Sequence, residues 1–213
     1  MSQEDILTEI AKVVVEFQTR RAKELIRKAL DRGIPPLEVV MDGLAAGLDV
    51  VGKRYEDGEY FLPELVAAGT TAKESLETLE PYLKGQGRWS KGSVIIGTVQ
   101  GDLHDIGKNI VSMMLLGAGL KVKDLGVDVP ASKFLDDAGR ERPDILALSC
   151  LLTTAMPRFS EVVRSLEDQG LRKELKILVG GNPVDANFAR SIGADGYAPD
   201  ALQAMRVAKD LIK

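Results

Sequence analysis

The residues best suited to chemistry lie in one short stretch, residues 101–110, with the sequence GDLHDIGKNI. His104 is the single histidine of the chain. Asp102, two residues earlier, is close enough to bind the Nδ1 proton of an imidazole, which leaves Nε2 free as a metal ligand or a base. Gly101 and Gly107 bracket the pair, and glycine allows a backbone to approach a bulky ligand closely. The stretch therefore predicts an imidazole-centred site.

The alternative for an isolated histidine is a packed or solvated bystander, which is the commoner case. Three local features favour a functional role for His104: the carboxylate of Asp102, the flanking glycines, and a helix expected to begin at the loop, whose amides face the same space. Any imidazole chemistry of this protein must take place here.

Composition excludes several other classes of protein. One Cys and one His cannot form an internal disulfide or a structural zinc site, which usually takes about four ligands. Lys and Arg number 28 against 32 Asp and Glu, giving a net charge of −4 without a long basic run, so we expect no nucleic-acid partner. No apolar run approaches the ~18 residues that cross a bilayer, and the N-terminus lacks the features of an export signal, so we expect a cytoplasmic protein without membrane contact.

The first part of the chain has apolar residues at helical spacing. Stripes cover residues 6–17 and 25–30, the second ending at Gly33. Pro35-Pro36 suits the start of a third helix that reaches Tyr55, and a fourth runs from about Pro63 to Leu83. The pattern predicts a four-helix bundle over residues 1–84, followed by a polar, glycine-containing linker at 85–92.

The remaining residues, 93–213, alternate short Val, Ile and Leu runs with helical segments. Five strands are predicted, at residues 94–99, 122–125, 145–148, 177–179 and 195–198. Strands alternating with helices indicate an α/β domain with a parallel, doubly wound sheet, and the flavodoxin-like (Rossmann-type) order 2-1-3-4-5 suits this number of strands. Ligands of such sheets bind beyond the carboxyl ends of the strands, where the strand order reverses, so the loops after strands 1, 3 and 4 are the expected site.

Three motifs in those loops carry a resemblance to a known family. Asp102-x-His104-x-x-Gly107 follows strand 1, Ser149-x-Leu151 follows strand 3, and Gly180-Gly181 follows strand 4. Together they resemble the cobalamin-binding domains of methionine synthase, the corrinoid methyl carriers and the base-off mutases. Residues 57–64, DGEYFLPE, are similar to the helical cap of the methyl-transferring branch, so the resemblance covers nearly the whole chain.

The resemblance implies a bound cobalamin, as methylcobalamin or cob(I)alamin, in the base-off/His-on state. His104 would replace the cofactor's dimethylbenzimidazole as the lower axial ligand of cobalt, with Asp102 as its hydrogen-bond partner. In methionine synthase a further hydroxyl residue extends this relay, and the matching position here is Ala155, so a third relay member is not assigned. The resemblance also implies a slot for the nucleotide tail, formed by Ser149, Leu151, Thr153, Gly180 and Gly181. Phe61 and Leu62 would cover the upper face of the cofactor.

Some of these residues keep a second interpretation. Gly180-Gly181 taken alone is equally typical of a strand-to-helix turn. Asp105, Lys108 and Asn109 either contact the amides of the corrin ring or form a solvated helix start. Cys150 is interpreted as a small buried residue.

The functional expectation is a carrier of methyl groups. The resemblance implies transfer on cobalt from a donor-specific methyltransferase (of the aryl methyl ether O-demethylase, methylamine or betaine, or methanol type) to a second methyltransferase that acts on tetrahydrofolate or a thiol. A reductive activase is a further expected partner, and the chain is not expected to turn over substrate alone. The alternatives are a cobalamin-dependent sensor or regulator and the small subunit of an adenosylcobalamin mutase.

Overall fold

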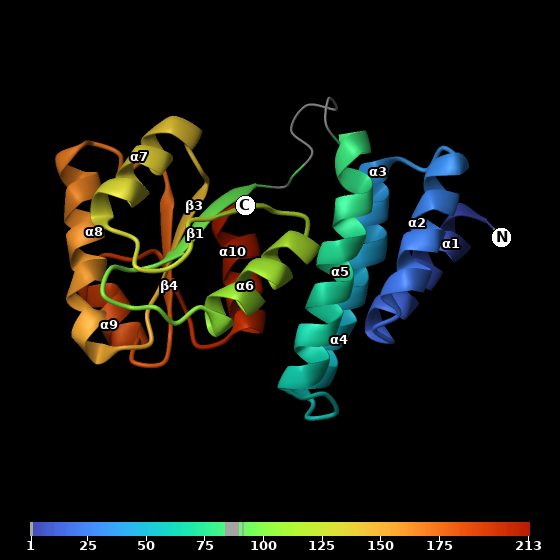
Figure 1. Cartoon of the computed structure of the whole chain (residues 1–213), viewed down its shortest axis with the longest axis horizontal. Coiled ribbons are helices and arrows are strands. Elements are labelled where there is room, and N and C mark those ends of the chain that lie inside the picture. The colour runs from blue at the N-terminus through green and yellow to red at the C-terminus, as the bar shows by residue number, and fades with distance from the viewer. Residues whose placement is uncertain (1, 84–89, 91) are drawn as a thin grey trace. The chain divides into compact units, whose positions relative to one another are not determined.

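The computed structural model describes residues 2–83, 90 and 92–213, and Figure 1 shows their elements. The chain divides into two compact units, residues 1–91 with 116–120, and residues 92–115 with 121–213. Most of the predicted linker, 85–92, lies outside the described residues, so its limits stay a prediction. Among the described helices, none is both long enough and apolar enough to cross a membrane.

The first unit is helical, as the apolar periodicity predicts. The third predicted helix is continuous from residue 36 to 56 and consists of three segments, of which the middle one is π-helical. The elements are α1 Gln3–Val15, α2 Thr19–Asp31, α3 Pro36–Glu38, η1 Val39–Ala45, α4 Ala46–Glu56 and α5 Leu62–Leu83. The four-helix prediction is therefore confirmed.

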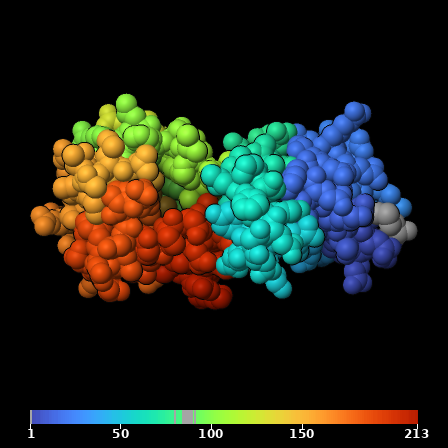
Figure 2. All heavy atoms as spheres, turned by 90° about the horizontal axis from the view of Figure 1, so that it is seen from below, coloured from blue at the N-terminus to red at the C-terminus, as the bar shows by residue number. Residues whose placement is uncertain are grey.

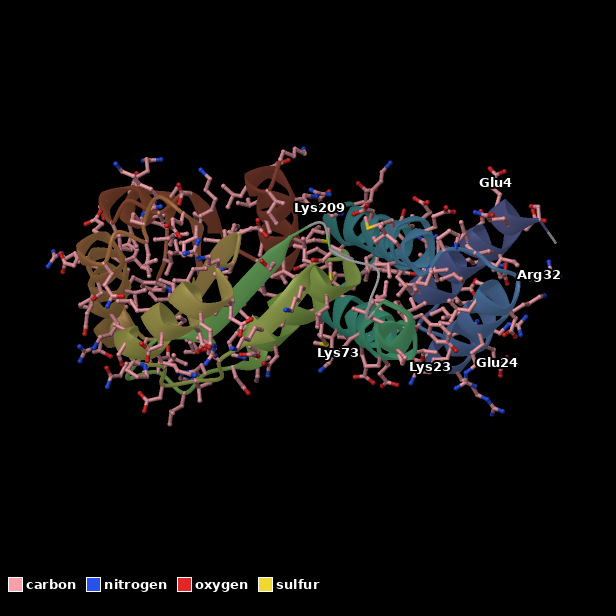
Figure 3. The ribbon with its side chains drawn as sticks, turned by 90° about the horizontal axis from the view of Figure 1, so that it is seen from above. Glu4, Lys23, Glu24, Arg32, Lys73 and Lys209 are labelled. Atoms are coloured by element: carbon pink, nitrogen blue, oxygen red, sulfur yellow. The ribbon has the colours of Figure 1, made fainter. Side chains whose placement is uncertain are left out.

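Local sequence signals explain the limits of these helices. Ser2 and Asp5 form a capping box at the start of α1, and Gly33, at φ 76°, follows the end of α2. One feature was not predicted: η1 is a π-helix. In it, Gly43 approaches α1 so closely that a Cβ would lie 2.9 Å from Ile10 Cγ2. Charged side chains such as Glu24 and Arg32 project outward from the bundle (Figure 3).

The second unit is a five-stranded parallel sheet with the order β2-β1-β3-β4-β5. This confirms the flavodoxin-like prediction. The strands are β1 Ser93–Thr98, β2 Lys121–Asp124, β3 Ile145–Ser149, β4 Lys176–Gly180 and β5 Gly196–Ala198. The helices are α6 Ile106–Gly117, α7 Ala131–Glu141, α8 Pro157–Asp168, α9 Ala186–Ser191 and α10 Ala201–Leu211, with a short 3-10 turn η2 at Thr153–Ala155.

Helices cover both faces of this sheet. Figure 1 shows α7, α8 and α9 on one face, and α6 and α10 on the other. The outer sides of α8, α9 and α10 form part of the surface in Figure 2 (orange to red). Since both faces are covered, the central strands β1 and β3 are almost entirely buried. Gly97 in β1 makes room for α7, because a Cβ there would lie 2.8 Å from Cζ of Phe134.

The register of the sheet aligns the strand ends that matter for function. Thr98, the last residue of β1, pairs with Ser149 of β3, and Ser149 pairs with Gly180 of β4. The chain order reverses between β1 and β3, because β2 lies on the other side of β1. The carboxyl ends of β1, β3 and β4 therefore present their loops side by side.

Candidate functional site

The loop between β1 and α6 is organised around the buried carboxylate of Asp102. This side chain has no exposed surface. Its Oδ1 accepts hydrogen bonds from the backbone N–H of His104, at 2.9 Å, and lies 2.7 Å from Nδ1 of the His104 ring. Its Oδ2 accepts from the backbone N–H groups of Leu151, at 2.5 Å, and Leu152, at 3.0 Å. One side chain thus joins the loop after β1 to the loop after β3.

The hydrogen bonds also fix the charge of Asp102. Burial by itself raises the pKa of this carboxyl, but donors from His104, Leu151 and Leu152 outweigh burial and hold the pKa well below its ordinary value. Asp102 is therefore a carboxylate at neutral pH, and it acts only as an acceptor.

This arrangement determines which nitrogen His104 offers. An ionised carboxylate beside Nδ1 favours the tautomer with its proton on Nδ1, and Nε2 then has its lone pair free. The side chain is 53% exposed. In that tautomer His104 offers Nε2 to an external ligand, in an orientation set by Asp102.

The loop that carries His104 and the loop after β3 expose large apolar side chains. In the described part of the second unit, the exposed large apolar residues all lie in the two loops joined by Asp102 or at the first residue of α6: Leu103 (72%), Ile106 (75%), Leu151 (45%) and Leu152 (38%). We call these four side chains the apolar rim. Sequence analysis singled out only Leu151 among them. The apolar residues Leu103 and Ile106, which flank His104 in an expected loop, were a signal that could have been used. Exposed apolar patches of this kind mark surfaces that bind a ligand or a partner.

The glycines of the two motifs differ in what they do. Gly101 has φ 89°, which the loop requires, whereas a Cβ on Gly107 would meet no atom within 4 Å. Folding therefore gives no steric reason for glycine at 107, and the missing side chain leaves open space at the start of α6. Gly181 has φ 122°, and a Cβ there would lie 1.8 Å from the carbonyl oxygen of Cys150. Gly181 is thus needed for the close approach of the β3 and β4 loops.

The predicted residues after β3 occupy different surroundings. Ser149 ends the strand and is half-buried, Leu151 lies on the apolar rim, and Thr153 is exposed in η2. Ala155 is buried and has no hydroxyl, and Oδ2 of Asp102 accepts from the backbone N–H groups of Leu151 and Leu152. Sequence reasoning missed these amides, because every residue has one and no side-chain pattern marks them.

Cys150, between Ser149 and Leu151, is buried as predicted. Burial raises the pKa of its thiol to about 11, and the thiol donates to the carbonyl of Leu152 at 2.9 Å. A protonated, buried thiol is neither a nucleophile nor a metal ligand.

Phe61 and Leu62 lie in the first unit, at the start of α5, with Phe61 66% exposed. The preceding residue is held firmly, because the Tyr60 hydroxyl donates to the carbonyl of Val15 and accepts from Arg54. The Phe61 N–H donates to Glu64 at 2.9 Å. These contacts fix the backbone of the segment and leave two apolar side chains free at its surface.

The donor set can be tested against the cofactor that the resemblance implies. Among the described residues, no group of three or more His, Cys, Asp or Glu side chains is placed to hold a metal ion. A corrin ring holds cobalt by its own nitrogens, so it does not require a cluster of protein ligands, and Nε2 of His104 could supply one further nitrogen. The apolar rim and the open space at Gly107 suit a large, partly apolar ring. The residues present therefore fit a corrinoid.

Comparison with known proteins gives the same result. Residues 92–206 match a family model described as a B12 binding domain, and residues 6–80 match a second model with the same description. The chain is 39% identical to trimethylamine corrinoid protein 1 of Methanosarcina acetivorans, over 94% of both chains. It is also 39% identical to dimethylamine corrinoid protein 1 of the same organism, over the full length of both.

Solved structures agree in fold. The methanol:cobalamin methyltransferase complex MtaBC of Methanosarcina barkeri contains a chain with a TM-score of 0.86 and 31% identity, over 100% of this chain and 81% of that one. A cobalamin-binding protein of Desulfitobacterium hafniense gives a TM-score of 0.79 and 32% identity, over 97% and 98% of the two chains. With both family models, these relatives and the site in agreement, the chain belongs to the family of B12-binding corrinoid proteins.

Proposed function

We propose that this protein carries methyl groups on a cobalamin bound base-off/His-on, with Nε2 of His104 as the lower ligand of cobalt. The observation that carries this proposal is the Asp102–His104 pair, in which Nδ1 contacts the carboxylate and Nε2 is left for a ligand on a half-exposed side chain. In this proposal residues 1–84 form the cap, 85–92 the linker and 93–213 the cobalamin-binding domain.

When bound, cobalamin supplies a cobalt atom that accepts a methyl group and gives it up again. The chain's own residues bind and orient the cofactor. Asp102 keeps the proton of His104 on Nδ1 and holds the ring in place, and the amides of Leu151 and Leu152 keep Asp102 ionised. The open space at Gly107 admits the ring to the loop.

The other predicted contacts complete the proposal. Ser149, Leu151 and Thr153 line the slot for the displaced nucleotide tail, and Gly180 and Gly181 allow that tail to pass close to β4. Phe61 and Leu62, apolar and exposed in the first unit, would exclude water from the reactive side of the cofactor.

The proposed partners are two methyltransferases and a reductive activase. Relatives named for trimethylamine and dimethylamine, and a structural neighbour from a methanol:cobalamin methyltransferase complex, support simple one-carbon donors. The methyl group would be passed on to tetrahydrofolate or a thiol by the second enzyme.

The single histidine makes a decisive test of the ligand possible. The protein is produced without a polyhistidine tag, with natural or ¹⁵N-labelled histidine, and is loaded with hydroxocobalamin and reduced to the cobalt(II) state. Electron paramagnetic resonance then reports the nitrogen below the cobalt. We expect labelling to change the nitrogen splitting from a triplet to a doublet, because His104 is the only labelled residue.

Two other outcomes would contradict the axial-ligand assignment. A triplet that persists after labelling would show that dimethylbenzimidazole remains bound, and no splitting would show that no nitrogen is bound. As a control, His104→Ala should lose the splitting of the protein nitrogen, and added imidazole should restore one that is insensitive to the label.

The carrier role is tested separately. The reduced holo-protein is mixed with trimethylamine, dimethylamine or methanol and the matching methyltransferase, with or without an acceptor methyltransferase. We expect methylated acceptor only when both enzymes are present. Methylation of the acceptor by this chain alone would contradict a carrier function.

A further inference from the structure

We propose that Thr98 is a positioning residue, whose hydroxyl holds the main chain of His104 in the place from which Nε2 meets the cobalt. This inference rests on the proposed function, since it concerns the same ligand. Thr98 belongs to none of the three motifs, and its side chain does not reach the ligand atom of His104. Its contribution would be to connect the ligand-bearing loop to the sheet.

Thr98 is itself a fixed point. It is the last residue of β1, is fully buried, and pairs with Ser149 of β3. Its N–H donates to the carbonyl of Gly126 and its carbonyl accepts from the N–H of Val129, both at 3.0 Å. Both hydrogen bonds of its backbone thus go to the segment that follows β2.

The Thr98 side chain connects this fixed strand end to the main chain of His104. Its Oγ1 donates to the carbonyl oxygen of His104 at 2.9 Å. The other two anchors of His104, at its N–H and at Nδ1, are both Oδ1 of Asp102. Asp102 lies on the same loop two residues away, and it ties that loop to the loop after β3 through the amides of Leu151 and Leu152. Thr98 instead fixes His104 relative to a central strand.

The hydroxyl group of Thr98 makes the link to His104. A buried hydroxyl needs a hydrogen-bond partner, and the chosen one is the carbonyl of the ligand-bearing residue. Valine would fill the same strand position, with a methyl group in place of the hydroxyl. The His104 carbonyl would then lose its donor, and the loop could move without any change in Asp102 or His104.

The experiment compares hydroxyl-containing with hydroxyl-free variants of the cobalamin-loaded protein. Thr98→Val is the main variant, and Thr98→Ser against Thr98→Ala is a matched pair that differs by one hydroxyl. The readouts are the nitrogen splitting of the cobalt(II) state and the cobalt(II)/cobalt(I) midpoint potential. Because cobalt(I) has no lower ligand, weaker nitrogen binding raises this potential.

We expect Thr98→Val and Thr98→Ala to weaken nitrogen ligation about threefold to tenfold, the range typical of one hydrogen bond. A tenfold loss corresponds to about 59 mV for a one-electron couple. Thr98→Ser should keep the wild-type potential. In the His104→Ala background, Thr98→Val should leave the potential unchanged, because the effect passes through His104.

Three results would overturn the assignment: a wild-type potential in the hydroxyl-free variants, a raised potential in Thr98→Ser, or a shift that persists without His104. If Thr98→Val fails to fold, the Ser and Ala pair decides. Failure of the proposed axial ligation looks different, because His104→Ala would then keep both the potential and the nitrogen splitting of the wild type.

Discussion

Replacing Asp102 by Asn tests the central hydrogen-bond arrangement with a change of one atom. The carboxylate accepts from four donors, two at each oxygen: the N–H and Nδ1 of His104 at Oδ1, and the N–H groups of Leu151 and Leu152 at Oδ2. An amide nitrogen cannot accept a hydrogen bond. In either orientation of the Asn side chain, its NH₂ group, itself a donor, therefore lies opposite two other donors.

The two orientations have different costs. With the amide nitrogen in the position of Oδ2, two backbone N–H groups lose a charged acceptor, at about 1.5–3 kcal/mol each. With the nitrogen in the position of Oδ1, the His104 ring can carry its proton on Nε2 and accept a hydrogen bond at Nδ1. Only the backbone N–H of His104 then lacks an acceptor. We therefore expect the second orientation, with a loss of about 2–3 kcal/mol in the free energy of unfolding.

This orientation also removes the ligand, because a protonated Nε2 has no lone pair for cobalt. The free energy is measured for the cofactor-free protein by urea unfolding, with amide hydrogen exchange of β1 and β3 reporting the second unit. Asp105→Asn is the matched control: it changes an exposed carboxylate of the same loop, whose Oδ2 accepts from Asn109. We expect it to stay within about 0.5 kcal/mol of the wild type.

The reasoning would be refuted if Asp102→Asn had the stability of the Asp105→Asn control. A retained nitrogen splitting from His104 in the loaded Asp102→Asn protein would refute the tautomer argument alone.

Two further predictions concern other parts of the second unit. Gly107→Ala should leave the stability of the cofactor-free protein unchanged or raise it by up to about 1 kcal/mol, because alanine favours a helix. The same change should weaken cobalamin binding in a spectrophotometric titration. An unchanged affinity would show that Gly107 is not part of the site. Hydrogen bonds from Lys123 and Lys133 lower the pKa of buried Asp137 to about 2, from an ordinary value of 3.8. Its contribution to stability is therefore complete above pH 4 and lost as the pH falls towards 2, and Asp137→Asn should flatten this part of the pH profile of unfolding; an unchanged profile would contradict the ion-pair assignment.

Much of the fold could be predicted because its causes are local or periodic. Apolar spacing placed the four helical segments and five strands, and their alternation indicated the parallel sheet and its order. The π-helical segment Val39–Ala45 was not predicted, since a local change in hydrogen-bond spacing leaves the apolar pattern almost unaltered.

The candidate site could be predicted only as far as side chains reveal it. The spacing of Asp102 and His104 pointed to their contact, and their position after strand 1 pointed to the switch point of the sheet. No third relay member was assigned from the sequence, and the further donors to Asp102 are the backbone amides of Leu151 and Leu152, which no side-chain pattern marks.

The sequence by itself determined the type of protein: one histidine with a carboxylate two residues away, three motifs after three strands, and a helical segment before them. Only the tertiary structure decided how His104 is held. The Leu151 and Leu152 partners of Asp102 come from the loop after β3, which the register of β1 and β3 brings beside the loop after β1, and the Thr98 link closes that loop back onto the end of its own strand. Such contacts depend on backbone atoms that are the same in every residue, so their position follows from folding and not from residue type.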